Sequence, residues 1–595
     1  MSTSDIRVAH AGELDQQLGK IGLRMQPYWD TQYLRNIEKW SSPKYKIKKD
    51  EDVFVEVRDG TRICLDVYRP DSEGTFPALV AISGYGKEVQ TIGVPPQPVE
   101  SMVFDHDLEI GDEKFFVSRG YTYVVVDPRG IGKSEGVFTG PFSVPDQQDA
   151  YDVIEWAAKQ PWSDGNVGMV GISWYGVMQV LAAEQAPPHL KVIAPGEAYL
   201  DFYRRSHDGG VLTTFYYYLE TVPNNPKLES ETLYSEQELE RLVARRLEDP
   251  DIRSISYFYK ALVDYKDKRQ TTFIDMLLHP TDGPFWRRRS GCYNLDKIRI
   301  PAYMFCWWGL GEFTRGAFDA FSGIQHKNKK VTMFLGAGTT GIKVRLPGFR
   351  EQLPDLLRWY DYWLKNIDNG IMDEPPVKFI VEGKDQYRWA SEFPPSGVAY
   401  RKLYLRRFGG LSFDPEEDGS LPPDLMVHQS PLVLAKKDSL SYSYEFNEGT
   451  EITGPVALYL NASIDQDDGN FVALLCDLSP AGKRRPLEKA LLKASHRTLD
   501  KTKSSLESPY IDHTVVTKAV PGEVYQFAFS FAPISNHFSA GHKLELVLTT
   551  EDALPQVHHH KLYLMTHVLN MRPTVFKMYR DSGYLSFLVL PFVRE

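Results

Sequence analysis

Residues 167–176, which read VGMVGISWYG, form a short apolar run ending in a serine between glycines. Residues 177–185 follow with a helix-forming composition. A strand, a tight turn and a helix in this order lift a serine hydroxyl out of a sheet on a strained backbone. Gly171 and Gly176 suit this arrangement, because strand and helix backbones pass too closely there for side chains. Ser173 is therefore the candidate nucleophile; the alternative is a small residue in a strand–helix turn without a chemical role.

The chain before this serine alternates strand and helix patterns. Residues 54–57 and 62–68 alternate and predict a hairpin, whereas 76–82 and 121–126 are continuous apolar runs typical of buried parallel strands. Residues 148–159 predict an amphipathic helix. This order implies a mostly parallel sheet with right-handed crossovers and flanking helices.

Beyond the serine the pattern changes twice. Residues 198–291 hold clustered aromatics and charged helical stretches, which predict a helical cap insertion, and the α/β pattern resumes over 292–375. From residue 376 to 595, short strands punctuated by Gly, Pro and Asn predict an all-β sandwich. We therefore expect an N-terminal extension (1–47), an α/β domain (48–197 and 292–375), the cap (198–291) and a β domain (376–595).

Composition narrows the function classes. A net charge of −11 argues against a nucleic-acid footprint, which needs clustered Lys and Arg. No apolar run approaches the roughly 20 residues of a membrane helix, and the polar start does not resemble a secretory signal. Four scattered cysteines without CxxC spacing predict neither a disulfide framework nor a zinc site. We expect a cytoplasmic protein that takes a small-molecule substrate; whether it forms a homo-oligomer stays open.

Acyl transfer also needs donors for a developing oxyanion. The backbone N–H of Trp174 follows the nucleophile directly, and Tyr85 stands between two glycines after the strand at 76–82. We expect the Tyr85 hydroxyl to be the second donor; the alternative is a tyrosine packed at the sheet edge.

Two further patterns invite a cofactor or metal interpretation. The glycines of residues 127–136 (DPRGIGKSEG) fit neither phosphate-loop spacing, so a structural loop ordered by an Asp, Arg and Glu network is favoured. The run His558 to His560 cannot chelate as a unit on a strand, because successive side chains point to opposite faces. We expect no cofactor and no metal.

Taken together, these motifs resemble the cocaine esterase/X-prolyl dipeptidyl-peptidase group (CocE/NonD type) of α/β hydrolases over residues 48–595. The segments that carry the resemblance are VRDGTR (57–62), GYGK (84–87), DPRGIGKSEG (127–136), QPWSDG (160–165), GISWYG (171–176), ITGP (452–455), ASHR (494–497), PGE (521–523) and PISNHFSAGHKL (533–544). The resemblance implies an α/β-hydrolase domain with a helical cap and a C-terminal jelly roll. It also implies serine-dependent cleavage of esters or amides without metal, with Ser173 as nucleophile and Tyr85 as oxyanion donor.

The acid and the base of the family do not carry over. Where the family places an aspartate, this chain has Gly311 or a neighbour, and Glu312 is a candidate replacement. The family histidine would fall on Thr340, while His326 precedes that strand and should lie at its opposite end. His207 in the cap is a candidate base from above the pocket; the alternative is a histidine on the cap surface.

Three hypotheses follow. The first is an ester or amide hydrolase, or acyltransferase, with atypical machinery. The second is a non-hydrolytic enzyme, such as a cyclase, isomerase, lyase or C–C cleaving enzyme, that reuses the pocket; the third is a non-catalytic binding protein. Trp307, Trp308, Phe215 and Tyr216 suggest a pocket for a bulky or aromatic ligand, although aromatics also build ordinary cores.

Overall fold

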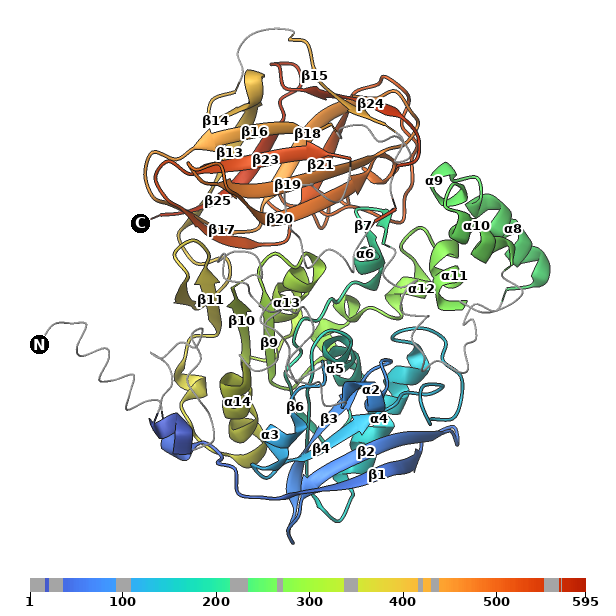
Figure 1. Ribbon diagram of the computed structural model, residues 1–595, viewed down its shortest axis with the longest axis vertical. Coiled ribbons are helices and arrows are strands. Elements are labelled where there is room, and N and C mark those ends of the chain that lie inside the picture. Colours follow the sequence, from blue (N-terminus) through green and yellow to red (C-terminus); the bar gives the residue numbers. More distant parts are fainter. Residues whose placement is uncertain are drawn as a thin grey trace, which may run out of the picture.

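A computed structural model describes the chain over residues 16–20, 36–91, 109–213, 234–264, 271–335, 352–415, 421–429, 438–550, 567–568 and 570–594. Two large sheets dominate it. The first occupies the lower half of the view in Figure 1, the second the upper half, and a group of helices projects to one side between them (Figure 1).

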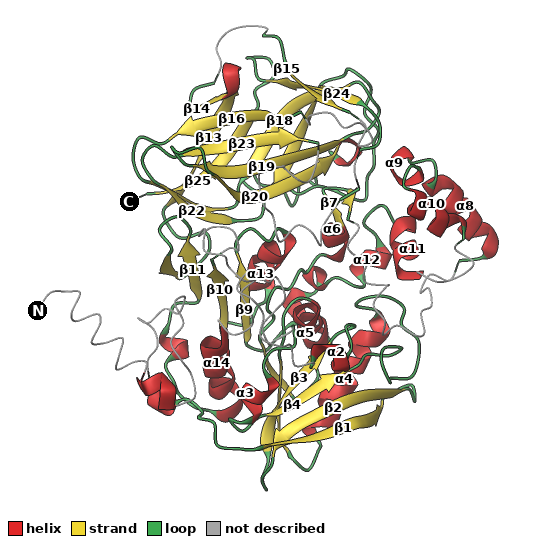
Figure 2. Cartoon of the chain, viewed as in Figure 1, coloured by secondary structure: helices red, strands yellow, loops and turns green. Residues whose placement is uncertain are grey.

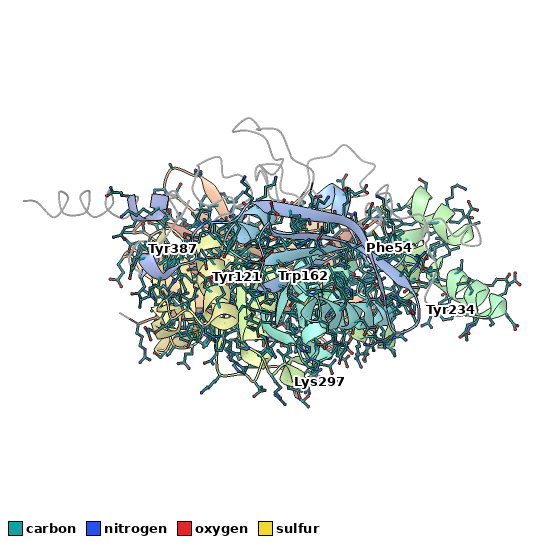
Figure 3. The ribbon with its side chains drawn as sticks, turned by 90° about the horizontal axis from the view of Figure 1, so that it is seen from below. Phe54, Tyr121, Trp162, Tyr234, Lys297 and Tyr387 are labelled. Carbon is teal, nitrogen blue, oxygen red and sulfur yellow. The ribbon has the colours of Figure 1, made fainter. Side chains whose placement is uncertain are left out.

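The first sheet has ten strands in the order β1-β2-β4-β3-β5-β6-β9-β10-β11-β12. Pairing is parallel from β4 to β11 and antiparallel at both ends. The strands are β1 (Ile47–Glu56), β2 (Arg62–Pro70), β3 (Phe76–Ile82), β4 (Thr122–Val126), β5 (Ser163–Met169), β6 (Leu190–Ile193), β9 (Ala302–Trp307), β10 (Lys329–Phe334), β11 (Val377–Val381) and β12 (Gln386–Ala390). Seen from below, Phe54 on β1 and Tyr387 on β12 mark the two edges, with Tyr121 and Trp162 between them (Figure 3).

Helices cover both faces of this sheet (Figure 2). Strand β3 shows why: Val80 points into one apolar cluster and Leu79 into the other, because successive side chains alternate across a strand. One cluster includes side chains of α4 (Val144–Ala158), α5 (Trp174–Glu184) and α13 (Glu312–Gly323), and the other includes side chains of α3 (Glu113–Val117) and α14 (Leu353–Lys365). Short α2 (Lys87–Gln90) follows β3. The predicted doubly covered parallel sheet is thus confirmed.

The insertion between β6 and β9 is mainly helical. Its helices are α6 (Phe202–Ser206), α8 (Glu236–Arg246), α9 (Pro250–Arg253), α10 (Ser256–Val263), α11 (Thr271–Leu278) and α12 (Pro284–Arg287). It also holds a small hairpin that the sequence pattern did not predict, β7 (His207–Asp208) paired with β8 (Val211–Leu212). Helices α8 to α11 share an apolar cluster of their own, apart from the sheet.

The second sheet builds the C-terminal β sandwich around one apolar interior. Its strands are β13 (Val398–Arg406), β14 (Gly410–Ser412), β15 (Asp424–His428), β16 (Leu440–Glu445), β17 (Thr450–Gly454), β18 (Ala457–Ile464), β19 (Asn470–Leu478), β20 (Arg484–Lys493), β21 (Tyr525–Ser530), β22 (Ile534–Phe538), β23 (Lys543–Thr549), β24 (Thr574–Tyr579) and β25 (Phe587–Val593). Brief 3₁₀ turns are η2 (Ile37–Lys39), η4 (Gly291–Tyr293), η5 (Leu295–Lys297), η7 (Ile371–Asp373), η8 (Arg407–Gly409) and η9 (Ala494–His496).

The domain boundary expected at residue 376 needs correction. Strands β11 and β12 pair with each other and with β10, so the first sheet continues to Ala390 and the second begins at Val398. The sequence pattern after Pro375 predicts strands without showing which sheet they join. An antiparallel strand pair at the edge of a parallel sheet has the same local pattern as a strand of a β sandwich.

The β domain contacts the α/β part close to the carboxyl ends of the parallel strands. The Arg315 guanidinium on α13 donates to the Ser530 carbonyl at 2.9 Å, and the Gly311 N–H donates to Glu488 at 3.3 Å. On the insertion side, Lys493 pairs with Asp251 at 3.3 Å. The β sandwich therefore abuts the edge where residues following β9 emerge.

Candidate active site

Ser173 holds the backbone conformation of a strained turn. It lies between β5 and α5 with φ 59° and ψ −118°, a left-handed region that costs a non-glycine residue roughly 1–3 kcal/mol. Its N–H donates to the Gly196 carbonyl at 2.9 Å, and the preceding Ile172 N–H donates to the Glu109 carbonyl at 3.0 Å. The surrounding hydrogen bonds therefore hold the serine at the carboxyl end of β5.

The glycines around Ser173 are required by close backbone approach. A Cβ on Gly176 would lie 2.2 Å from the Gly196 carbonyl oxygen, and one on Gly171, which has φ +118°, would lie 2.4 Å from the Tyr175 Cβ. Neither contact can be relieved without moving backbone or the first atom of a side chain. The predicted strand–turn–helix arrangement is thus observed.

Trp174 begins α5, and its side chain anchors that start. The indole is 5% exposed and packs against Phe142, with 5.3 Å between ring centroids. Its backbone N–H is at the first helical position, where no intrahelical acceptor exists. This N–H lies next to the serine, and its role as an oxyanion donor stays a prediction.

Tyr85 lies beside Trp174, in the loop between β3 and α2. The two rings meet edge to face with 5.3 Å between centroids, and Gly84 leaves room for the indole, since a Cβ there would lie 2.5 Å from it. Tyr85 is half-buried, and its hydroxyl lies near enough to the Glu109 carboxyl group to lower the pKa of that group. Tyr85 is therefore at the site, with its hydroxyl directed to a carboxyl group that the sequence analysis did not identify.

The loop carrying Tyr85 is held from behind by a buried lysine. Lys87 is 1% exposed, and its ammonium pairs with Asp66 at 2.9 Å and with Asp52 at 2.8 Å. Burial alone would lower the pKa of Lys87, but the hydrogen bonds with these carboxylates outweigh it and raise the pKa. Its backbone N–H also donates to Asp127 at 2.6 Å.

Glu109 is the site residue that the sequence analysis missed. The Ser173 and Tyr85 hydroxyls lie near enough to its carboxyl group to lower its pKa, and its Oε2 is buried without a partner among the described residues. Burial, followed by the nearby Glu197 carboxylate, raises the pKa of Glu109 to about 8, although the two hydroxyls oppose the shift. A carboxyl group with a raised pKa therefore lies beside the candidate nucleophile.

Glu197 belongs to the loop after β6, which also supplies the carbonyl that binds Ser173. Its φ is 43°, a second left-handed non-glycine residue beside the site, and its N–H donates to the Phe305 carbonyl at 2.8 Å. Three segments, 83–87, 109–110 and 196–197, thus converge on the serine with a hydroxyl and two carboxyl groups.

Glu312, the candidate replacement acid, is occupied elsewhere. Its carboxylate pairs with Arg315 one turn along α13, at 3.0 Å, and Arg315 in turn binds Ser530 of the β domain. Gly311 just before it has φ +55°, and a Cβ there would face open space. The first turn of α13 thus uses Glu312 to tie the helix to the β domain.

His207, the candidate base, lies in a buried aromatic cluster and not on the cap surface. It is 1% exposed and stacks on Tyr203 with 4.9 Å between centroids and an interplanar angle of 4°. Burial, with help from Arg246, lowers its pKa well below the usual value, and neither ring nitrogen has a hydrogen-bond partner among the described residues. No contact joins it to Ser173, because the β7–β8 hairpin turns it toward the β domain.

The other described histidines also lie away from Ser173. His326 precedes β10, at the opposite end of the sheet as predicted. His496 and His513 face each other at 3.2 Å beside the insertion, and His542 pairs with Asp477 at 2.7 Å. Within the described ranges no group of three His, Cys, Asp or Glu side chains could hold a metal ion. Thr340 and the run from His558 to His560 fall outside these ranges.

The aromatic residues expected to line a pocket are largely core. Trp307 and Trp308 are each 1% exposed; Trp307 packs on Phe334, and the Trp308 indole N–H donates to the Ile380 carbonyl at 2.7 Å. Trp307 ends β9 and belongs to one apolar cluster of the sheet, and Trp308, just after the strand, belongs to the other. Phe215 and Tyr216 lie outside the described residues. Leu310, half-buried like Tyr85, packs against both apolar clusters.

The glycine-rich segment after β4 is a structural loop, as favoured from its sequence. Arg129 pairs with Asp149 at 2.6 Å and with Asp59 at 2.9 Å, and Glu135 pairs with Arg62. A Cβ on Gly132 would lie 2.1 Å from the Asp127 carboxyl, so this glycine allows the loop to fold over that side chain.

Comparison with known proteins agrees with this geometry. The family model for X-Pro dipeptidyl-peptidase (S15 family) matches residues 59–339, and the model for the X-Pro dipeptidyl-peptidase C-terminal non-catalytic domain matches residues 369–571. The fold and the strained serine define an α/β hydrolase. With both models matched in order, the chain belongs to the CocE/NonD-type X-Pro dipeptidyl-peptidase (S15) family.

Individual relatives span nearly the whole chain. A cocaine esterase from Rhodococcus sp. is 26% identical over 609 residues, which cover 91% of this chain and 98% of the relative. The crystal structure of a CocE/NonD family hydrolase from Staphylococcus aureus superposes with a TM-score of 0.74 at 26% identity, covering 92% of this chain and 94% of the other. An α-amino acid ester hydrolase shares the fold, with a TM-score of 0.68 at 18% identity. No helix in the described ranges is long and apolar enough to cross a membrane.

Proposed function

We propose that the protein is a serine hydrolase that cleaves esters or amides of small molecules by acyl transfer through Ser173. The observation that carries this proposal is the backbone of Ser173, held at φ 59° and ψ −118° by hydrogen bonds from two neighbouring loops. A serine in an ordinary turn needs no such strain, whereas a nucleophile presented above a sheet does. Names of the relatives, an esterase and an ester hydrolase, favour esters as the first substrates to try.

The reaction would proceed in two acyl-transfer steps. The Ser173 Oγ attacks the carbonyl carbon, and the Trp174 N–H and the Tyr85 hydroxyl donate to the oxyanion that forms. The leaving alcohol or amine departs with a proton, and water then hydrolyses the acyl-serine. One oxyanion donor of this kind contributes on the order of 10²–10³ in turnover.

The catalytic machinery is atypical in this proposal. Removing the histidine of a complete serine triad costs on the order of a millionfold in turnover, so an unassisted Ser173 would be a poor nucleophile. By the resemblance to the family, its histidine would fall on Thr340, and the Glu312 and His207 side chains make their contacts with Arg315 and Tyr203. No contact among the described residues favours the non-hydrolytic alternative.

Hydrolysis of p-nitrophenyl acetate, butyrate and phenylacetate, with an X-Pro p-nitroanilide beside them, tests the function. We expect the wild type to hydrolyse at least one ester and Ser173→Ala to fall to the uncatalysed rate. Ser72→Ala, at an exposed turn, is the matched control and should match the wild type. Equal rates for Ser173→Ala and the wild type would refute the proposal.

A further inference from the structure

We propose that the Glu109 carboxylate is the general base for Ser173, in place of a histidine, and that Glu197, which follows the Gly196 carbonyl bound to the Ser173 N–H, is a positioning residue for it. This inference rests on the proposed function, because it assigns the base for the same acyl transfer. It is carried by the position of Glu109, whose carbonyl accepts the N–H of Ile172 beside the serine and whose carboxyl group lies near enough to the Ser173 hydroxyl for the two to interact.

The backbone of Glu109 is held on both sides. Its carbonyl accepts the Ile172 N–H at 3.0 Å, and the next residue, Ile110, is 1% exposed and accepts a hydrogen bond from the buried Tyr123 hydroxyl through its carbonyl. A Cβ on Gly171 would come within 3.1 Å of the Glu109 carbonyl oxygen. The turn at 109–110 therefore packs directly on the strand that leads to Ser173.

The carboxyl group of Glu109 has the contacts that a base for the serine needs. A general base must lie close to the proton that it takes, and the Ser173 hydroxyl lies near enough to this carboxyl group to lower its pKa. A base also works best when its pKa lies near the working pH. An ordinary glutamate, with a pKa near 4.3, is too weak a base for this task.

The surroundings of Glu109 raise its pKa and so make its carboxylate a stronger base. Groups facing the Glu109 carboxyl are the Ser173 and Tyr85 hydroxyls, the Glu197 carboxylate and the Tyr175 phenol from α5. Among the residues that the structure describes, no lysine, arginine or histidine contributes to the shift of its pKa, which burial and then Glu197 raise to about 8. Like charge and burial both favour the protonated form, so they make the carboxylate a stronger base.

The proton can be followed through each step. As the bond from Ser173 Oγ to the carbonyl carbon forms, the hydroxyl proton moves to the Glu109 carboxylate, and the carbonyl electron pair becomes the oxyanion. The neutral Glu109 acid is a poorer acceptor, so the Tyr85 hydroxyl turns from it to the oxyanion. When the bond to the leaving group breaks, Glu109 returns its proton to that group. In the second half it accepts a proton from water, which hydrolyses the acyl-serine, and gives that proton back to Ser173.

The pH dependence of ester hydrolysis tests this assignment. We expect wild-type kcat/KM to rise with pH around a midpoint near 8, since Glu109 must be deprotonated to act. Glu109→Gln should lose at least about a hundredfold in kcat. Glu197→Gln removes the like charge and should shift the midpoint to lower pH, with more activity than the wild type below the old midpoint.

A matched control shows whether the pH dependence of hydrolysis comes from Glu109 or from another buried carboxyl group with a raised pKa. Glu184 at the end of α5 is bound to Asn294, and burial raises its pKa to about 8 as well. Glu184→Gln should leave the pH profile unchanged. His106, three residues before Glu109 in the sequence, lies outside the described residues, and His106→Gln should retain the wild-type midpoint.

Chemical rescue guards against a variant that merely misfolds. Formate or azide should restore part of the hydrolysis to Glu109→Ala and none to Ser173→Ala. Full activity of Glu109→Gln would overturn the inference and leave Ser173 as nucleophile. The same holds if His106→Gln loses activity while Glu109→Gln stays active. Retained activity in Ser173→Ala would instead overturn the proposed function itself.

Discussion

The residue at position 173 must tolerate a left-handed backbone and still carry a nucleophilic atom. Serine is held there because Gly196 and Glu109 accept hydrogen bonds from the N–H groups of Ser173 and Ile172, and because glycines let the strand and helix approach. The same packing brings Glu109 to the hydroxyl. The contacts that hold the strained backbone of Ser173 thus also place the proposed base, Glu109, beside its hydroxyl.

Tyr85→Phe tests the oxyanion role at this scale. Loss of the hydroxyl should lower kcat by about 10²–10³ while KM changes little, because the missing hydrogen bond forms mainly in the transition state. Steady-state ester hydrolysis measures both constants. Tyr45→Phe, whose ring packs on Phe76 far from the serine in the sheet, is the control. A Tyr85→Phe enzyme with unchanged kcat would leave Tyr85 only a packing role.

At the scale of elements, the loop between β3 and α2 depends on a buried charge. Lys87 and Asp66 are each 1% exposed and bind one another, while Asp127 accepts the Lys87 backbone N–H. Three elements, β2, β4 and α2, are thereby tied behind Tyr85. The ion pair positions the loop that carries the oxyanion donor.

Lys87→Met should destabilise the protein by about 3–5 kcal/mol, because it leaves the Asp66 carboxylate buried with fewer partners. Lys133→Met is a matched control: Lys133 is half exposed and also pairs with Asp52, so its loss should cost far less stability than the loss of Lys87. Urea unfolding followed by circular dichroism gives both values. Similar costs for the two variants would contradict the account.

Prediction from sequence succeeded where the determinant is local. The apolar run at 76–82 coincides with β3 and the glycine pattern at 171–176 with the serine turn. Glu109 could not be found in this way, because its role depends on a turn distant in sequence that packs against residue 172. A single acidic residue in a polar segment leaves no periodic pattern in the sequence. Its position just before the apolar stretch at 115–126 is the one sequence feature that points to Glu109.

At the scale of the whole molecule, the insertion and the β domain meet beside a group of histidines. The Tyr203 ring of the insertion packs on His513 of the β domain with 5.0 Å between centroids, and His207 stacks on the same tyrosine, while His496 faces His513. Burial lowers the pKa of His207 and His513 well below normal and that of His496 to about 4, with Arg246 and Lys493 adding to the effect. The neutral rings are therefore part of this contact.

Acid should weaken this contact. The folded state binds fewer protons than the unfolded one, whose histidines titrate near 6.5, so the stability contribution is complete above pH 6.5 and is lost as pH falls toward 4. His207→Phe keeps the stacking on Tyr203 and removes one titrating group. We expect thermal melts from pH 7.5 to 4.5 to fall less steeply for this variant, with ester hydrolysis retained. Loss of hydrolysis would restore His207 as a catalytic candidate.

The central claim is that Ser173 is an activated nucleophile whose proton passes to Glu109. Intact-mass analysis after exposure to a fluorophosphonate tests it most directly. The account predicts one adduct per wild-type chain, none on Ser173→Ala, and labelling of Glu109→Gln slowed at least about a hundredfold. An unlabelled wild type, or an adduct that persists in Ser173→Ala, would contradict it.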